Sequence, residues 1–584
     1  MFSYKAPLNE MSFLLNDVFL ASMIWSDIPN FADVIDVDVA SDILTESSKF
    51  AENIIYPVNR SGDEQGVSFK DKSVITPEGY KKAFEIYAQN GWVGLCGSPD
   101  YGGMGMPKVL GVLVDEMAFG ASNAFALFSS LTAGAAICIN AHAEDNLKKT
   151  FLPKLYSGEW TAAMDMTESQ AGSDLKHITT KAVPLSDGCY SISGSKIFIT
   201  GGDHDLTNNI VHLVLAKLPN ANNLSLFLVP KRWVNADGSL SDKNGVEVIS
   251  IEQKMGIKAS PTCAVNFDGA KGYLIGKSNR GLIYMFTMIN YERLSIGIQG
   301  LASSQAAYQM ALDYAKNRHQ GQGSKIANKD SDPIIVHGDV RRMLMIVKSL
   351  TDAGRAFLVY LGLQIDLANY SQNDQQKKSA KQYTEFLTPV AKAFLTDRGF
   401  ESTVLAQQIF GGHGYIRETG IEQLVRDSRI AQIYEGTNGI QAIDFLSRKV
   451  LGDNLAILAR FFDELKSNMN AFIFSSKNEI QIVNDYFDQI ISSAIFINTQ
   501  KLTRPSLLNS CAVDFLDAFG YVLYGYFWLL MVEKVTVTEN TSLINQKTHL
   551  KHFYFAKLLP KARYHLALVN AGDEMMMTHD KDLF

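Results

Sequence analysis

The chain has few of the features that mark secreted or metal-binding proteins. It has five cysteines among 584 residues, and no two of them form a Cys-x-x-Cys pair. This isolation argues against a disulfide framework and against a zinc site. We therefore expect that no metal is bound and that the thiols are buried in a protein of a reducing compartment. The first residues show no basic start followed by an apolar run and a small-residue cleavage site. We therefore expect no secretory leader and a cytoplasmic location.

Two further shortages argue against nucleic-acid and membrane partners. The formal net charge is −7, whereas a nucleic-acid-binding surface needs a basic patch or domain. The longest apolar run, residues 519–532, is shorter than the roughly 20 residues of a spanning helix, which favours a buried helix. In residues 451–584, Lys and Arg do not follow an amphipathic face, so we expect subunit contacts there and not membrane binding.

The spacing of apolar residues divides the chain into blocks of different character. Helical spacing recurs before and after a middle stretch of short alternating runs, which turns such as Asp187-Gly188 and Asp237-Gly238 separate. This order predicts an α+β fold, with a helical domain, a middle antiparallel β-domain and a C-terminal helical bundle. The expected domains are an N-terminal extension (1–40), an N-terminal helical domain (41–160), the β-domain (161–278), the bundle (279–450) and an additional helical domain (451–584).

Individual elements can be placed within these blocks. In the bundle, apolar residues at three-four spacing predict helices over residues 285–318, 339–367 and 382–410, with a solvated break at residues 373–378. In the β-domain, runs such as Lys196-Phe198-Thr200 alternate as a regular strand does.

The first two motifs combine small residues with hydroxyls. Residues 164–174 contain Thr167 and, after a stretch of small side chains that lets backbone approach a ligand, Ser173. Alone, this segment is a helix cap and a loop. Residues 194–201 form a strand that ends in Thr200 and a glycine pair, and alone this is a plain edge strand.

Three more motifs follow in the bundle. Arg318 stands near a helix end, where its guanidinium suits a phosphate, although alone it is a solvated cation. A helix ending at Gln408 is followed by Gly411 and Gly412, which alone is a helix stop. This glycine cluster lacks the preceding strand of a dinucleotide fingerprint. Last comes a Tyr-Glu-Gly-Thr segment with Glu435 in its centre.

Together, in this order and spacing, these motifs resemble the acyl-CoA dehydrogenase family over roughly residues 80 to 450. The resemblance implies FAD as cofactor. It places Thr167 at the flavin pyrimidine edge, and Thr200 near the reactive flavin nitrogen. Phe198 stands where many members have Trp. The FAD-binding residues it implies are Met166, Thr167, Phe198, Ile199, Thr200, Arg318, Gln408, Gly411, Gly412 and Thr437, with Arg318, Gln408 and the glycines often serving the neighbouring subunit.

The resemblance also implies the substrate and its chemistry. The substrate is an acyl-CoA thioester, contacted by Ser173, Asn290, Arg293, Glu435 and Gly436. Glu435 abstracts the α-proton while the β-hydrogen leaves as hydride to the flavin, and a trans-2-enoyl-CoA forms. Because burial raises the pKa of a carboxyl group, a Glu in such a site can act as a base near neutral pH.

A second carboxylate competes for the role of base. Glu292 lies in the segment Asn290–Leu294, and some family members place their base on this helix. Two buried carboxylates repel each other and split their pKa values. We favour Glu435, whose motif is complete, and interpret Glu292 as a structural partner of Arg293 or of a neighbouring Arg.

Three features resemble the bacterial 3-methylmercaptopropionyl-CoA dehydrogenase type within this family. They are the N-terminal segment 4–19, the Arg318-His-Gln-Gly321 segment and the long C-terminal extension. The substrate expected is 3-methylmercaptopropionyl-CoA or a fatty acyl-CoA, the electron acceptor an electron-transferring flavoprotein, and the assembly a homodimer or homotetramer. Two alternatives stay open, which are an acyl-CoA oxidase that uses oxygen and a catalytically silent assembly scaffold.

Overall fold

The structure, a computed structural model, describes residues 3–235, 237–323, 331–577 and 581–583. The chain divides into two compact units. We call one the helical unit (Met1–Thr45, Lys108–Glu116 and Ile296–Phe584) and the other the sheet unit (Glu46–Pro107 and Met117–Ser295). The N-terminal extension and the additional C-terminal helices therefore belong to the same unit as the central bundle.

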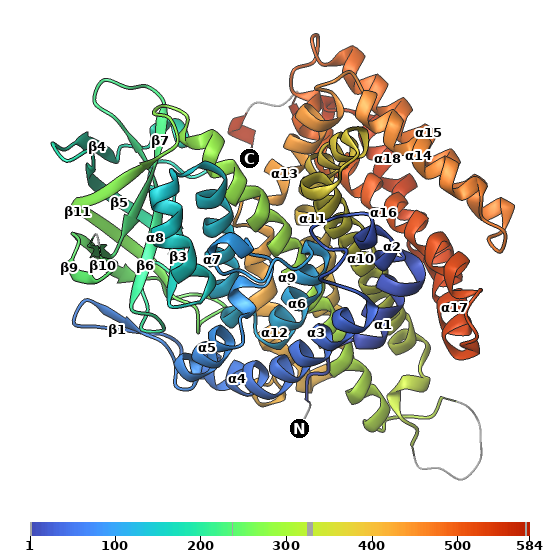
Figure 1. The fold of residues 1–584 in the computed structure, drawn as a ribbon. Helices are drawn as coiled ribbons and strands as arrows, with labels where there is room; N and C mark the ends of the chain where they lie inside the picture. The colour runs from blue at the N-terminus through green and yellow to red at the C-terminus, as the bar shows by residue number, and fades with distance from the viewer. Residues whose placement is uncertain (1–2, 236, 324–330, 578–580, 584) are drawn as a thin grey trace. The chain divides into compact units, whose positions relative to one another are not determined.

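A seven-stranded sheet forms the middle of the sheet unit (Figure 1). Its strands follow the order β10-β11-β5-β4-β6-β3, and β7 pairs with both β11 and β6. The sheet is mixed, which corrects the prediction of antiparallel pairing throughout, because β3 runs parallel to β6. The chain makes the antiparallel β4–β5 pair between these two strands and so enters β6 in the direction of β3. The strands are β1 (Ser68–Lys70), β2 (Ser73–Ile75), β3 (Trp160–Asp165), β4 (Lys181–Pro184), β5 (Tyr190–Thr200), β6 (Asn209–Lys217), β7 (Leu224–Pro230), β8 (Arg232–Val234), β9 (Leu240–Lys243), β10 (Val246–Ile251) and β11 (Thr262–Ile275).

Both faces of this sheet are buried at strands β6 and β7. Val211 and Leu213 of β6 share one apolar core with Ile139 and Leu152 from two helices. Val214, on the other face, shares a second core with strand residues of β5 and β11. Successive strand residues point to opposite faces, so β6 must be apolar throughout, as it is. The helices of this part of the chain are α3 (Val37–Phe50), α4 (Tyr56–Gln65), α5 (Tyr80–Gln89), α6 (Lys108–Ala121), α7 (Asn123–His142) and α8 (Asp145–Tyr156).

Long helices build the core of the helical unit. The helix predicted over residues 382–410 begins earlier, at Asp374, because the Asn373 side chain caps it by accepting from the backbone N–H groups of Gln375 and Gln376. The predicted break at residues 373–378 is therefore mostly an exposed first turn. The helices here are α9 (Gly281–Asn317), which starts in the sheet unit, α10 (Gly338–Tyr370), α11 (Asp374–Ile409), α12 (Ile421–Arg429) and α13 (Asn438–Asp444).

The additional C-terminal helices share the core of the bundle. Helix α16 (Leu507–Val535) is wholly buried over its most apolar window, and a Cβ at Gly520 would lie 2.4 Å from the ring of Phe394 on α11. Within the described residues, α7 and α16 are long and apolar enough to cross a membrane, and both are mostly buried. The prediction of a buried helix over residues 519–532 agrees with this. The remaining helices are α1 (Leu8–Ser12), α2 (Ala21–Ser26), α14 (Ala456–Asn470), α15 (Lys477–Gln500), α17 (Thr541–Lys557), α18 (Lys561–Ala571) and α19 (Glu574–Met577).

A buried charge cluster joins the two ends of the chain to the bundle. Lys547 of α17 donates to Asp352 of α10 at 2.9 Å, and Lys348 donates to Glu10 of α1 at 3.1 Å. Arg355, also on α10, lies 3.6 Å from Asp352. Removing one partner of such a cluster leaves a buried charge uncompensated, which is costly. The terminal extensions are therefore fixed parts of the helical unit.

Candidate active site

In the sheet unit, two of the predicted flavin-binding segments lie side by side. The backbone N–H of Ile197 on β5 donates to the carbonyl of Thr167 at 2.9 Å, and the Lys196 ammonium donates to the carbonyl of Met166 at 3.0 Å. The hydroxyls of Thr167 and Thr200 make no hydrogen bond to another residue that the structure describes. Both side chains are half-buried, so these hydroxyls remain available to the polar edge of a ligand such as a flavin.

Strand β5 is bulged where it carries Phe198. The register with β11 shifts between Lys196 and Ile199, and Phe198 has a positive φ of 60°. The bulge turns the Phe198 ring outward, 60% exposed, while Ile199 is buried in the core of the sheet. The regular alternation predicted for Lys196, Phe198 and Thr200 is therefore wrong, and Ile199 can reach a flavin only through its backbone.

A buried ion pair fixes the loop that carries Thr167. The Glu168 carboxylate accepts from the Lys196 ammonium at 2.9 Å and from the backbone N–H groups and hydroxyls of Thr179 and Thr180. Burial opposes ionisation of Glu168, but the Lys196 charge and these hydrogen bonds outweigh burial and lower its pKa to about 2. Burial lowers the pKa of Lys196, and Glu168 opposes this effect. The sequence motif gave this pair no role, although period-two alternation from Ile192 places Lys196 on a buried face.

Ser173 and Gly172 lie in the exposed loop after this ion pair. A Cβ built at Gly172 would meet no atom within 4 Å, so the small residues leave open space at this loop. This is compatible with the predicted contact between Ser173 and the CoA part of a substrate.

In the helical unit, Glu435 occupies a strained turn. Glu435 and Gly436 have φ values of 56° and 83°, a left-handed conformation that costs a non-glycine residue about 1–2 kcal/mol. The Gln441 amide donates to the Glu435 carbonyl at 3.1 Å. Thr437 caps α13 by accepting from the Ile440 N–H. The Glu435 side chain is half-buried, so it combines limited solvation with access for a ligand.

The second candidate base has a partner in the sheet unit. Glu292 on α9 is 1% exposed and accepts from the Ser130 hydroxyl of α7 at 2.8 Å. A Cβ at Gly134, one turn further along α7, would lie 2.5 Å from the other Glu292 oxygen. The glycine therefore makes room for this carboxylate, which is held between two helices.

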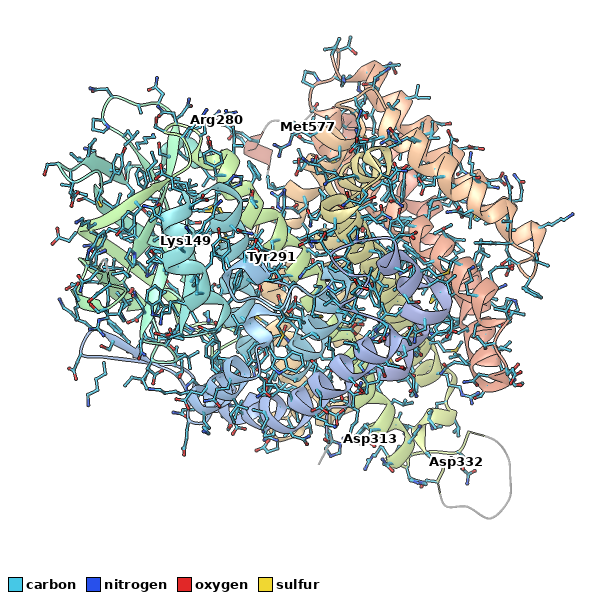
Figure 2. The ribbon with its side chains drawn as sticks, in the orientation of Figure 1. Lys149, Arg280, Tyr291, Asp313, Asp332 and Met577 are labelled. Carbon is cyan, nitrogen blue, oxygen red and sulfur yellow. The ribbon has the colours of Figure 1, made fainter. Side chains whose placement is uncertain are left out.

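Helix α9 also carries the two residues predicted to reach the CoA moiety. In Figure 2, Arg280 labels the residue directly before this helix, and Tyr291 and Asp313 label two residues within it. Asn290 is exposed, whereas Arg293 is 8% exposed and its guanidinium lies 5.9 Å from the Phe286 ring centre.

The structure brings the predicted pyrophosphate-binding residues together at one end of the helical unit. Tyr314 of α9 stacks on Phe410, with ring centres 4.1 Å apart, and its hydroxyl lies 3.0 Å from a ring nitrogen of His413. This contact joins the two helix ends that carry Arg318, Gln408, Gly411 and Gly412. All four residues are exposed, and a Cβ at either glycine would meet nothing within 4 Å.

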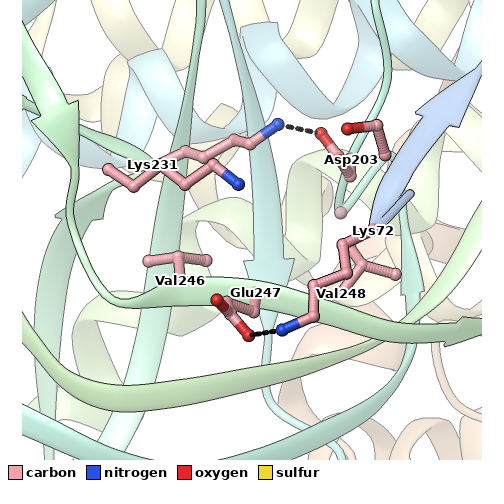
Figure 3. A pocket seen from close by; sticks show the side chains of 9 residues that line it. Lys72, Asp203, Lys231, Val246, Glu247 and Val248 are labelled. Atoms are coloured by element: carbon pink, nitrogen blue, oxygen red, sulfur yellow. Dashed lines mark hydrogen bonds and ion pairs between the residues drawn. The ribbon is translucent and has the colours of Figure 1, made fainter.

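A surface pocket elsewhere in the sheet unit is not part of this site. Its two carboxylates, Asp203 and Glu247, are already paired with Lys231 and Lys72 (Figure 3). None of the predicted ligand-binding residues lines it. The lining residues are Lys72, Ser73, Gly202, Asp203, Lys231, Lys243, Val246, Glu247 and Val248.

The chain thus combines a mixed sheet that is bulged at Phe198 with a helical unit that holds the strained turn at Glu435. Four domain families match along it. They are the acyl-CoA dehydrogenase N-terminal domain (40–159), middle domain (163–270) and C-terminal domain (279–450), and the acetyl-CoA dehydrogenase C-terminal-like domain (461–580). The chain belongs to the acyl-CoA dehydrogenase family, a family of FAD-dependent oxidoreductases that act on acyl-CoA.

Similar proteins include two curated relatives and a solved structure. A 3-methylmercaptopropionyl-CoA dehydrogenase of Ruegeria pomeroyi is 42% identical, over 79% of this chain and 78% of its own. A butyryl-CoA dehydrogenase of Syntrophomonas wolfei is 32% identical, over 96% and 95%. An acyl-CoA dehydrogenase complexed with FAD from Bacillus anthracis has a TM-score of 0.75 at 21% identity, over 100% and 94% of the two chains. This last likeness shows that the fold extends through the additional C-terminal helices.

Proposed function

We propose that the protein converts an acyl-CoA thioester to the trans-2-enoyl-CoA, with Glu435 as the base that removes the α-proton. The observation that carries this proposal is the turn at Glu435, a half-buried carboxylate held in a left-handed conformation within the Tyr-Glu-Gly-Thr motif. Strained backbone of this kind persists where the surroundings hold it, and it is concentrated at functional sites.

The reaction divides between protein and cofactor. A thioester α-proton is weakly acidic, so its carbonyl oxygen needs donors that stabilise the developing enolate, and the Glu435 backbone N–H is the donor we assign in this chain. The Glu435 carboxylate takes the proton. The chemistry that bound FAD supplies is acceptance of the β-hydrogen with its electron pair. In the sheet unit, Thr167 and Thr200 offer free hydroxyls to the flavin edge, and the outward Phe198 ring offers an apolar surface.

The substrate we propose is 3-methylmercaptopropionyl-CoA or a fatty acyl-CoA, with an electron-transferring flavoprotein as acceptor. The two relatives are named for different acyl groups, so the acyl chain is the part that needs a direct test. Bleaching of the bound flavin by a panel of acyl-CoAs, 3-methylmercaptopropionyl-CoA included, ranks them. Rapid peroxide formation in air would show an oxidase instead.

We also propose a homo-oligomer in which the patch formed by Arg318, Gln408, Gly411 and Gly412 binds the FAD of a neighbouring subunit. Helix α11 supports this proposal, because Lys392, which contacts the Glu435 turn, and Gln408 are separated by about 24 Å along its axis. Arg318→Ala is expected to weaken FAD binding without changing the proton-transfer step.

The assignment of the base is tested by a matched pair of variants. Glu435→Gln is expected to lower the rate of anaerobic flavin reduction by about 10²–10⁴-fold, the usual contribution of a general base. Glu292→Gln, which keeps a hydrogen-bond acceptor for Ser130, is expected to reduce the flavin at close to the wild-type rate. A Glu435→Gln variant that reduces the flavin normally would overturn the assignment.

A further inference from the structure

One short stretch of helix α11 forms hydrogen bonds with the chain on both sides of the Glu435 turn. Before the turn, the Gln432 amide donates to Asp397 at 2.6 Å. After the turn, Asn438 donates to the same Asp397 oxygen at 2.7 Å and to Thr396 at 3.0 Å. The five residues between Gln432 and Asn438 are therefore attached at both ends to the same helix.

The centre of this attachment is a buried lysine. Lys392 is 0% exposed, and its ammonium donates to the Gly436 carbonyl at 2.8 Å and to the Asn438 side-chain oxygen at 2.8 Å. The Gly436 carbonyl belongs to the residue directly after the base. Lys392 and Thr396 stand one helical turn apart, so both project from the same side of α11 toward the turn.

Burying an ammonium group costs several kcal/mol, and the hydrogen bonds of Lys392 to the turn offset part of that cost. Because Gly436 directly follows Glu435, the position of the Gly436 carbonyl also limits where the Glu435 side chain can lie.

We propose that Lys392 is a positioning residue for the proton-abstraction step: its ammonium holds the Gly436 carbonyl, which fixes the left-handed turn of Glu435. This inference rests on the proposed role of Glu435. Lys392 lies outside the sequence motifs described above, and no local sequence signal points to it.

The test compares Lys392→Met with wild type and with Lys551→Met. Lys551 is also a buried lysine of the helical unit, 4% exposed, and its partner is Glu479 on α15. We expect Lys392→Met to retain FAD and substrate affinity but to reduce the flavin about 100-fold more slowly, because a small misplacement of a reacting group costs this much. Lys551→Met should reduce the flavin at close to the wild-type rate.

A second variant tests the same proposal if Lys392→Met does not fold. Asn438→Ala removes the amide that holds both Lys392 and Asp397 while leaving the lysine in place. It is expected to slow flavin reduction about tenfold, again with unchanged substrate affinity, because the turn loses part of its attachment.

The outcomes separate this inference from the proposed function. If Glu435→Gln is inactive while Lys392→Met and Asn438→Ala reduce the flavin at the wild-type rate, the role of Lys392 is wrong and the base assignment stands. If Glu435→Gln reduces the flavin normally, the base assignment itself fails.

Discussion

Two segments, one in each unit, hold a non-glycine residue in left-handed backbone conformation beside a buried lysine. Phe198 has a φ of 60° and follows Lys196 by two residues, whereas Glu435 has a φ of 56° and precedes the glycine that Lys392 contacts. In both segments the ammonium donates to a backbone carbonyl. Each lysine therefore stabilises a conformation that the local sequence alone disfavours.

The difference lies in what the two ammonium groups hold. Lys196 donates to the Glu168 carboxylate within the same buried cluster, so its charge is neutralised where it stands. Two hydrogen bonds of Lys392 go to oxygens of Gly436 and Asn438, which directly follow and flank the proposed base. The first lysine therefore stabilises a buried loop, whereas the second fixes the backbone beside a reacting group. The comparison thus predicts a structural defect in one segment and a kinetic one in the other.

We expect the largest effect, a loss of folding stability, when the Lys196–Glu168 ion pair is broken. Lys196→Met leaves the Glu168 carboxylate buried without its cation, and breaking a buried pair in this way costs about 3–5 kcal/mol. Denaturant unfolding of the FAD-free protein measures this loss, and FAD affinity should fall with it because Lys196 also holds the Met166 carbonyl. The double variant Lys196→Met with Glu168→Leu removes both charges and should recover part of the stability. A Lys196→Met protein within 1 kcal/mol of wild type would show that the pair does not stabilise this loop.

A smaller effect, dependent on pH, is expected for Glu168→Gln. Hydrogen bonds to a charged group contribute about 1.5–3 kcal/mol, so we expect a loss near 2 kcal/mol at neutral pH. Because the folded-state pKa of Glu168 is lowered to about 2 from 4.5, its stabilising contribution is complete above pH 4.5 and is lost as the pH falls toward 2. The stability gap between wild type and Glu168→Gln should therefore be constant at higher pH and close over this window. If the stability difference between wild type and Glu168→Gln persists at pH 2, this prediction is wrong.

The regular elements could be predicted from the sequence, and candidate site residues could be named, because their signals are local. Three-four and period-two spacing gave the long helices and the strands, and contiguous motifs gave Thr167, Thr200 and Glu435. The start of α11 was missed because the polar run after Asn373 suggests a loop, although Asn373 caps the helix there. Its position depends on a single side-chain cap, which hydrophobic periodicity does not detect.

The supporting residues depend on contacts between distant parts of the chain. The Phe198 bulge results from its pairing with β11, a strand that begins more than sixty residues later. Lys392 meets the Glu435 turn across more than forty residues, and the terminal extensions meet through Lys547 and Glu10. Hydrogen bonds and ion pairs between distant residues leave no periodic trace in the sequence, so the supports of the site could be found only from the structure.

We expect the smallest change in folding stability at Phe198, where a substitution can separate the cost of backbone strain from the role of the ring. Glycine adopts a φ of 60° without penalty, so Phe198→Gly relieves about 1–2 kcal/mol of backbone strain, offset by about 0.5–1 kcal/mol of added chain entropy in the unfolded state. We expect the FAD-free protein to be more stable by roughly 0.5–1 kcal/mol and FAD binding to be weaker, because the exposed ring is lost. Phe198→Ala is the matched control, since it removes the ring but keeps the Cβ that causes the strain. If both variants destabilise the FAD-free protein equally, the ring contributes to folding, and the bulge at Phe198 is not maintained for the cofactor.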